Sequence, residues 1–216
     1  MAGRFSSSYK MAGLKTDPFY DTSAGMGHGG ANQGLSSLTN GFLNNGVSYI
    51  SPKVMGAVTV NAAIFLDNED NSPNGLDPQS NPKNFGITYN AGGITASVQH
   101  FTDADVNGEG ATRGTFAYAA NAFAVALSYE DWDSGDEFTY LSGSYKLSDN
   151  TKLAASFGDV DSQATAGQNM AGESITVGVY QKVAPQTTIS LLFSDVDADS
   201  GGNDRQTAAL GIIQTF

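Results

Sequence analysis

The sequence has no cysteine, only two histidines and few basic residues: ten Lys and Arg stand against 22 Asp and Glu, a net charge of −12 over 216 residues. Without cysteine, disulfides and thiolate metal sites are excluded. The excess of acid repels phosphate backbones and argues against nucleic-acid binding. Long apolar runs are also missing. The longest, 122–127, spans six residues, too few for a transmembrane helix or the core of a signal peptide. By composition alone, the chain resembles a soluble acidic protein.

The hydrophobic pattern points elsewhere, because segment after segment alternates with a period of two and almost nothing repeats at 3.6 residues. Phe123, Val125 and Leu127, for example, share one face of a strand, and small or polar residues occupy the other. Eleven such strands are expected, at 45–51, 55–66, 83–90, 93–101, 112–120, 122–130, 138–147, 151–158, 174–183, 187–194 and 205–216.

The connections between these strands alternate strictly between tight turns and longer loops rich in Gly, Asp, Asn and Ser. The longer loops are expected at 67–82, 102–111, 131–137, 159–173 and 195–204. Short turns at one end and long loops at the other are typical of outer-membrane barrels, and a Greek-key sandwich would not sort its loops in this way. The sequence therefore predicts an all-β fold, a transmembrane antiparallel β-barrel.

A repeated motif closes every strand that runs toward a long loop: an aromatic residue followed by acids two and four positions later. Its aromatic residues are Phe65, Phe101, Tyr129, Phe157 and Phe193. In the last three copies the ring lies on the lipid-facing side, where it suits the membrane interface, and the acids continue that face beyond the bilayer. We expect the aromatic girdle to comprise Tyr129, Phe157, Phe193 and Phe216. The following acids form a rim expected to hold divalent cations loosely: Asp131, Asp133, Asp159, Asp161, Asp195 and Asp197.

The first two copies of the motif have a different phase. Their more apolar faces do not include Phe65 and Phe101, which therefore point inward unless a β-bulge intervenes. Those apolar faces could instead pack on another subunit. The pattern leaves bulge and interface open.

Charge is sorted by segment. The five long loops, with the third counted from residue 130, carry 19 of the 22 acids and no Lys or Arg. Five basic residues lie on strand faces assigned to the lumen: Arg113, Lys146, Lys152, Lys182 and Arg205. This assignment is also the energetically permitted one, because a basic residue facing lipid near the midplane would cost about 2–4 kcal/mol. Basic residues on the wall and acids on a constriction would set a transverse field across a pore.

The first part of the chain carries a family resemblance. The segments Gly-Arg-Phe-Ser at 3–6, Asp-Pro-Phe-Tyr-Asp at 17–21 and Asn-Gly-Val-Ser-Tyr-Ile-Ser-Pro at 45–52, together with the terminal Phe216, resemble the general porins of Gram-negative outer membranes. In that family a strand ending in Gly-Arg runs into a long third loop, and the chain returns through a strand ending in Ser-Pro.

The resemblance implies a sixteen-stranded, trimeric barrel whose third loop folds inward and narrows the channel. Residues 1–44 would be the end of a strand plus this constriction loop, which would carry Lys10, Lys15, Asp17 and Asp21; residues 45–216 would be the eleven transmembrane strands. Eleven antiparallel strands cannot close on themselves. We therefore expect an N-terminally incomplete porin in which Met1 is not the native start; a complete barrel of ten or twelve strands is the alternative.

The function implied is passive diffusion of small hydrophilic solutes and ions through a water-filled, mildly cation-selective channel. The alternatives are a non-conducting structural or adhesin barrel and a secreted soluble β protein. No Ser-His-Asp or metal-helix spacing supports an enzyme, and no cofactor is expected beyond loosely bound Ca²⁺ or Mg²⁺ at the rim. The expected partners are the outer-membrane bilayer, lipopolysaccharide and two further copies of the chain.

Overall fold

The strands form one antiparallel sheet in which each strand pairs with its neighbours in the sequence. The computed structural model of the chain describes residues 1–20, 22–25, 33–36, 38, 41–66, 81–102, 109–162, 171–199 and 204–215. Its strands are β1 (Ala2–Phe5), β2 (Leu43–Ile50), β3 (Val58–Phe65), β4 (Lys83–Ala91), β5 (Ile94–Phe101), β6 (Ala111–Ala120), β7 (Phe123–Trp132), β8 (Glu137–Lys146), β9 (Thr151–Asp161), β10 (Gly172–Ala184), β11 (Thr187–Ala198) and β12 (Arg205–Gln214).

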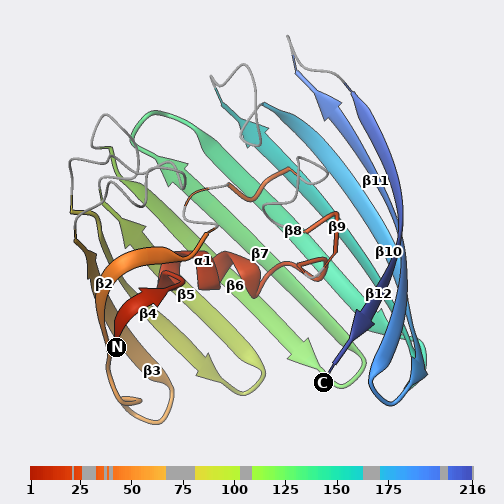
Figure 1. Cartoon of the computed structure of the whole chain (residues 1–216), viewed down its shortest axis with the longest axis horizontal. Helices are drawn as coiled ribbons and strands as arrows, with labels where there is room; N and C mark the ends of the chain where they lie inside the picture. The colour runs from red at the N-terminus through yellow and green to blue at the C-terminus, as the bar shows by residue number, and fades with distance from the viewer. Residues whose placement is uncertain are drawn as a thin grey trace.

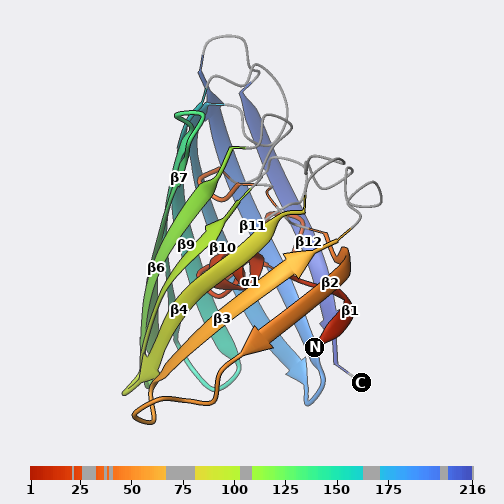
Figure 2. The same ribbon diagram turned by 90° about the vertical axis from the view of Figure 1, so that its left-hand side faces the viewer.

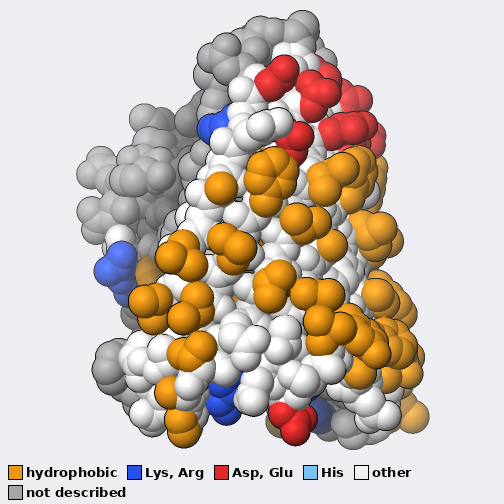
Figure 3. Space-filling view, turned by 90° about the vertical axis from the view of Figure 1, so that its right-hand side faces the viewer, with side chains coloured by type: hydrophobic (Ala, Val, Ile, Leu, Met, Phe, Trp, Pro, Cys, Tyr) orange, Lys and Arg blue, Asp and Glu red, His pale blue; other side chains and the backbone are white. Residues whose placement is uncertain are grey.

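The alternation of side chains follows the predicted period, with the apolar residues outside. In β10, Ile175, Val177 and Val179 are exposed, whereas Ser174 and Thr176 between them are buried. Exposed apolar and buried polar residues are the reverse of a soluble protein and suit a sheet whose outer face meets lipid. Figure 3 shows this apolar band on one side of the sheet, with acidic residues gathered above it.

The sheet curves around the only helix in the described part of the chain, α1 (Ser8–Leu14). Figures 1 and 2 show α1 on the concave side, and its contacts are with β4, β5 and β6. No helix among the described residues is long and apolar enough to cross a membrane. Over the same residues β1 and β12 are not paired, so the sheet curls without closing.

The predicted fold class is confirmed, and the eleven expected strands all occur, preceded by the short β1. Several strands are longer than expected at the end that carries the long loops. The loop predicted at 131–137 is only a four-residue turn, 133–136, because β7 continues to Trp132. Trp132 pairs with Ala111 of β6, and Asp131 pairs with Glu137 of β8. The hydrogen-bonded pairing of β7 therefore continues beyond Tyr129, the aromatic residue of its motif.

The burial of Phe65 and Phe101 shows which face of the sheet the first two aromatic motifs occupy. Phe65 and Phe101 are fully buried on the inner side, and their rings stack with centroids 6.0 Å apart. The same buried cluster also contains Phe5, Tyr9, Leu38, Leu43 and Ala111. The pairings of β3 with β4 and of β5 with β6 run without a register shift, so the expected inward orientation holds and no bulge intervenes there.

Candidate functional site

Between β1 and β2 the chain lies inside the curved sheet over its described residues, 6–20, 22–25, 33–36, 38 and 41–42. We call these residues the inner loop. Its first described feature is α1, where the Ser7 side chain caps the N-terminus by accepting a hydrogen bond from the Lys10 backbone N–H at 3.0 Å. The buried side of α1 includes Tyr9, Ala12 and Leu14. This short helix is therefore held against the wall by its apolar residues.

A buried ion pair lies beneath α1. Arg113 and Glu130 are directly opposed in β6 and β7, both are inaccessible to solvent, and Arg113 Nε donates to Glu130 Oε2 at 2.9 Å. Glu130 Oε1 accepts three further hydrogen bonds, from Tyr9 Oη at 2.7 Å, Ser36 Oγ at 2.6 Å and Trp132 Nε1 at 2.6 Å. We call these residues the Arg113–Glu130 anchor.

The anchor joins the wall to both ends of the inner loop. Arg113 Nη1 donates to the Tyr9 carbonyl at 3.1 Å, its Nη2 donates to Ser36 Oγ at 3.0 Å, and its guanidinium lies 4.4 Å from the Tyr9 ring centroid. Burial raises the pKa of the Tyr9 phenol well above its usual value, and the Glu130 carboxylate raises it further. Tyr9 therefore stays protonated and keeps donating to Glu130.

Two expectations from the sequence need correction here. Glu130, counted with the acids of the third long loop, is buried inside because its side chain lies on the inner face of β7 and neutralises Arg113. Arg113 does lie on the inner face, but it is fully buried under the loop and does not line open space. Its guanidinium group instead binds Glu130 and the inner loop.

A second attachment is made by the Asp-Pro-Phe segment. Asp17 Oδ1 accepts hydrogen bonds from Tyr140 Oη at 3.0 Å and from the Phe19 backbone N–H at 2.8 Å. Tyr180 Oη donates to the Pro18 carbonyl at 2.9 Å, and the fully buried Phe19 ring stacks on Tyr180 with centroids 6.4 Å apart. This segment is therefore tied to β8 and β10.

Residues 33–36 of the inner loop lie very close to the wall. The Gln33 N–H donates to Ser174 Oγ at 2.8 Å. Gly158 of β9 faces the loop so closely that a Cβ there would lie 1.9 Å from the Gln33 carbonyl oxygen. Gly34, at φ +83°, lies against Thr139 of β8. Only glycine permits this approach.

Substituting Gly158 with alanine is therefore expected to push the inner loop off the wall. Overpacking of this kind destabilises by about 1–3 kcal/mol. The matched control is Gly143→Ala in β8, where the new Cβ would come no closer than 3.5 Å to any neighbour. Urea unfolding in detergent micelles checks this; equal midpoints for the two variants would show that the loop does not press on β9.

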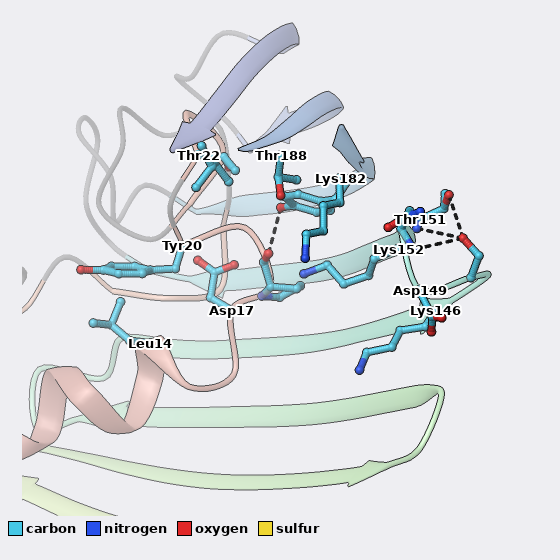
Figure 4. A pocket seen from close by; sticks show the side chains of 15 residues that line it. Leu14, Asp17, Tyr20, Thr22, Lys146, Asp149, Thr151, Lys152, Lys182 and Thr188 are labelled. Atoms are coloured by element: carbon cyan, nitrogen blue, oxygen red, sulfur yellow. Dashed lines mark hydrogen bonds between the residues drawn. The ribbon is translucent and has the colours of Figure 1, made fainter. Parts of the chain in front are cut away.

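Three lysines line a cavity of about 550 Å³ between the inner loop and the wall. Lys146, Lys152 and Lys182 come from the short-turn ends of β8, β9 and β10. Figure 4 shows the Lys152 and Lys182 side chains extending toward the part of the loop that carries Asp17, with Lys146 on the next strand. Thus the structure places three predicted lumen lysines and one predicted loop acid around one space.

The other loop residues are more scattered. Lys10 is buried, its Nζ lies 5.4 Å from the Phe42 ring centroid, and burial lowers the pKa of its ammonium group. Lys15 is exposed and lines a separate cavity between α1 and the wall. Arg205 is exposed at the start of β12, opposite the inward-facing Val196. Asp21 and Phe216 lie outside the described residues.

On the outer surface, Tyr129, Phe157 and Phe193 are all exposed, at 44%, 36% and 44%. The expected rim acids follow them at the strand ends, mostly exposed: Asp131, Asp133, Asp159, Asp161, Asp195 and Asp197. Among them, Asp133 Oδ2 accepts a hydrogen bond from the Gly110 N–H at 2.9 Å. No group of three or more metal-ligating side chains occurs within the described ranges.

Sequence reasoning missed the roles of Tyr9, Ser36, Tyr140 and Tyr180 in holding the loop. The roles of Tyr140 and Tyr180 could have been predicted, because each occupies the inner face of its strand among small residues. A large phenol there needs a surface to pack on and a hydrogen-bond partner for its hydroxyl. For Ser36 the sequence offers no comparable sign.

Comparison with known proteins agrees with this architecture. The Salmonella typhi OmpF structure in complex with daunomycin aligns with a TM-score of 0.77 at 13% identity, covering 99% of this chain and 73% of that one. The anion-selective porin from Comamonas acidovorans aligns with a TM-score of 0.63 at 17% identity, covering 99% and 68%. OmpT, an outer-membrane protein of Vibrio cholerae, aligns with a TM-score of 0.59 at 17% identity, covering 96% of this chain and 72% of that one.

At such identities the structural likeness shows the fold alone. No curated protein sequence matches the chain significantly. A family model, however, matches residues 1–215, nearly the whole chain, and it describes the Gram-negative porins. With the curved antiparallel sheet, the apolar outer band and the loop packed inside, this match identifies the chain as a member of the Gram-negative porin family, proteins of the outer membrane.

Proposed function

We propose that the protein is a non-enzymatic, water-filled channel for passive diffusion of small hydrophilic solutes and ions, with a mild preference for cations. The observation that carries the proposal is the inner loop. It is fastened inside the curved sheet at several points and narrows the interior without filling it, since cavities of about 550 Å³ and 350 Å³ remain on either side of α1 and the segment that follows it.

The chemistry of the inner wall supports the same proposal. Hydroxyl groups occupy directly opposed positions across five consecutive strands, in the row Thr59, Thr88, Ser97, Thr115 and Ser128. Small neutral hydroxyls offer hydrogen bonds to water and to sugars without strong binding, which suits a diffusion path. A structural or adhesin barrel would favour bulkier side chains at these positions.

The preference for cations rests on the exposed carboxylates at the long-loop ends of the strands. Asp131, Asp161, Asp195 and Asp197 are exposed there, and a mouth of one charge raises the local concentration of counter-ions. One structural neighbour is described as anion-selective, so selectivity is argued from this chain's own charges. We also propose that the protein forms homotrimers, as the family resemblance implies, and that the rim carboxylates bind lipopolysaccharide through loosely held Ca²⁺ or Mg²⁺.

Planar-bilayer recording tests the channel. We expect ohmic single-channel steps and, in a KCl gradient, a reversal potential that favours K⁺. Because the Debye length falls from about 10 Å at 0.1 M to about 3 Å at 1 M ionic strength, the preference should shrink as salt is raised. Insertion without conductance would support the structural or adhesin alternative instead.

A further inference from the structure

We propose that Lys146, Lys152 and Lys182 form a binding subsite for small multivalent oxyanions, such as phosphate-bearing solutes, on the inner wall near the short turns. The proposal rests on the channel function proposed above, because the three side chains face the interior, where solutes would pass. The subsite lies near the short turns, whereas the proposed cation preference arises from the carboxylates at the long-loop ends of the strands.

The convergence of the lysines follows from strand register. Lys146 and Lys152 are directly paired across β8 and β9, and Lys152 is paired with Tyr180 of β10, two residues from Lys182 on the same face. Inner-face positions on three adjacent strands therefore carry three ammonium groups around one cavity. Figure 4 shows the Lys152 and Lys182 side chains directed toward the loop from neighbouring strands.

Three positive charges share this cavity with only two acidic side chains, and within the described structure they are not held together by ion pairs. Among the described residues, none of the three forms an ion pair. The cavity is also lined by two acids, Asp17 and Asp149, but Asp17 already accepts hydrogen bonds from Tyr140 and the Phe19 N–H. Like charges held together repel, and a bound multivalent anion would relieve that repulsion.

The surroundings fit an oxyanion in other respects. Lys152 Nζ lies 4.2 Å from the Tyr180 ring centroid, a cation–π contact that restrains its side chain. Tyr180 in turn is fixed by its hydrogen bond to the Pro18 carbonyl. Thr151 and Thr188 add hydroxyl groups to the lining. A phosphate group would thus meet several charge-assisted donors from a partly preorganised wall, in a cavity with room for the solute that carries it.

Binding of inorganic pyrophosphate to the detergent-solubilised protein tests the subsite, with titration calorimetry at low salt. We expect saturable binding, and the Lys146→Gln, Lys152→Gln double variant should weaken it by about tenfold or more, because two charge-assisted contacts are lost. The matched control is Lys53→Gln, Lys83→Gln, which removes two charges from exposed positions away from the cavity. Urea midpoints confirm that both variants fold.

A parallel bilayer measurement separates this proposal from the channel function. Pyrophosphate added on the short-turn side should reduce the KCl conductance of the wild type and of the control, but much less that of the lysine variant. Normal KCl conductance with equal pyrophosphate affinity in both variants would overturn the subsite and leave the channel standing. Loss of KCl conductance itself would overturn the channel, while calorimetry would still decide whether the subsite binds.

Discussion

Replacing Glu130 with alanine should destabilise the folded protein by about 3–5 kcal/mol, the cost of leaving a buried charge without its partner. Arg113 would keep its hydrogen bonds to the Tyr9 carbonyl and Ser36 but lose its only buried counter-charge in the described structure. Tyr9, Ser36 and Trp132 would at the same time lose their shared acceptor. Urea unfolding followed by circular dichroism measures the change, and single-channel recording should show a larger, noisier conductance as the loop detaches.

Two variants make this prediction specific to the anchor. Glu173→Ala removes an exposed carboxylate from β10, and surface changes usually stay within about 0.5 kcal/mol. The double variant Arg113→Met, Glu130→Leu removes both charges, so it should recover part of the stability lost in Glu130→Ala. An unfolding midpoint for Glu130→Ala equal to that of Glu173→Ala would contradict the anchoring role.

Replacing Phe19 with alanine should lower the free energy of unfolding by about 3–5 kcal/mol, the cost of truncating a fully buried ring. Phe19 packs with Ala24, Ala154, Tyr180 and Leu192 between the inner loop and the wall. A cavity left there would free the Asp-Pro-Phe segment from β10 and widen the space in front of the lysines. Both the urea midpoint and the single-channel conductance should therefore change, the first downward and the second upward.

The neighbouring residue supplies the control. Tyr20 is also aromatic and lies in the same turn, but it is 38% exposed and lines the cavity instead of packing on the wall. Tyr20→Ala should lower stability far less than Phe19→Ala. If the two variants unfold at the same urea concentration, the Phe19 contact does not hold the loop.

The strands could be predicted because a period of two, set by the geometry of the extended chain, survives in any single sequence. The same alternation placed Phe65 and Phe101 inward. It also places Glu130 on the inner face, although the charge count includes that residue with the acids of the third long loop. The expected strand 122–130 ends two residues before β7 does. Where a strand ends depends on how far its partner continues, and β8 begins as early as Glu137.

The inner loop was less predictable for a different reason. Helix α1 is two turns long, too short to show a periodicity, and it is marked only by the Ser7 cap. The orientation of each loop side chain depends on distant partners: Asp17 bonds to Tyr140, 123 residues away. Sequence alone could name Asp17 as a loop acid but could not show that its carboxylate is largely occupied by a tyrosine and a backbone amide.

The long sequence separations of these contacts also predict the order in which the inner loop and the sheet fold. The inner loop precedes β2 in the chain, yet its attachments reach forward by 121 residues from Tyr9 to Glu130, by 141 from Gln33 to Ser174 and by 162 from Pro18 to Tyr180. Such contacts close late in folding, so a segment made early docks only once β6 to β10 have assembled around it. Trp132, the single tryptophan of the chain, donates to Glu130 at that junction, and its fluorescence would report the docking step separately from assembly of the sheet.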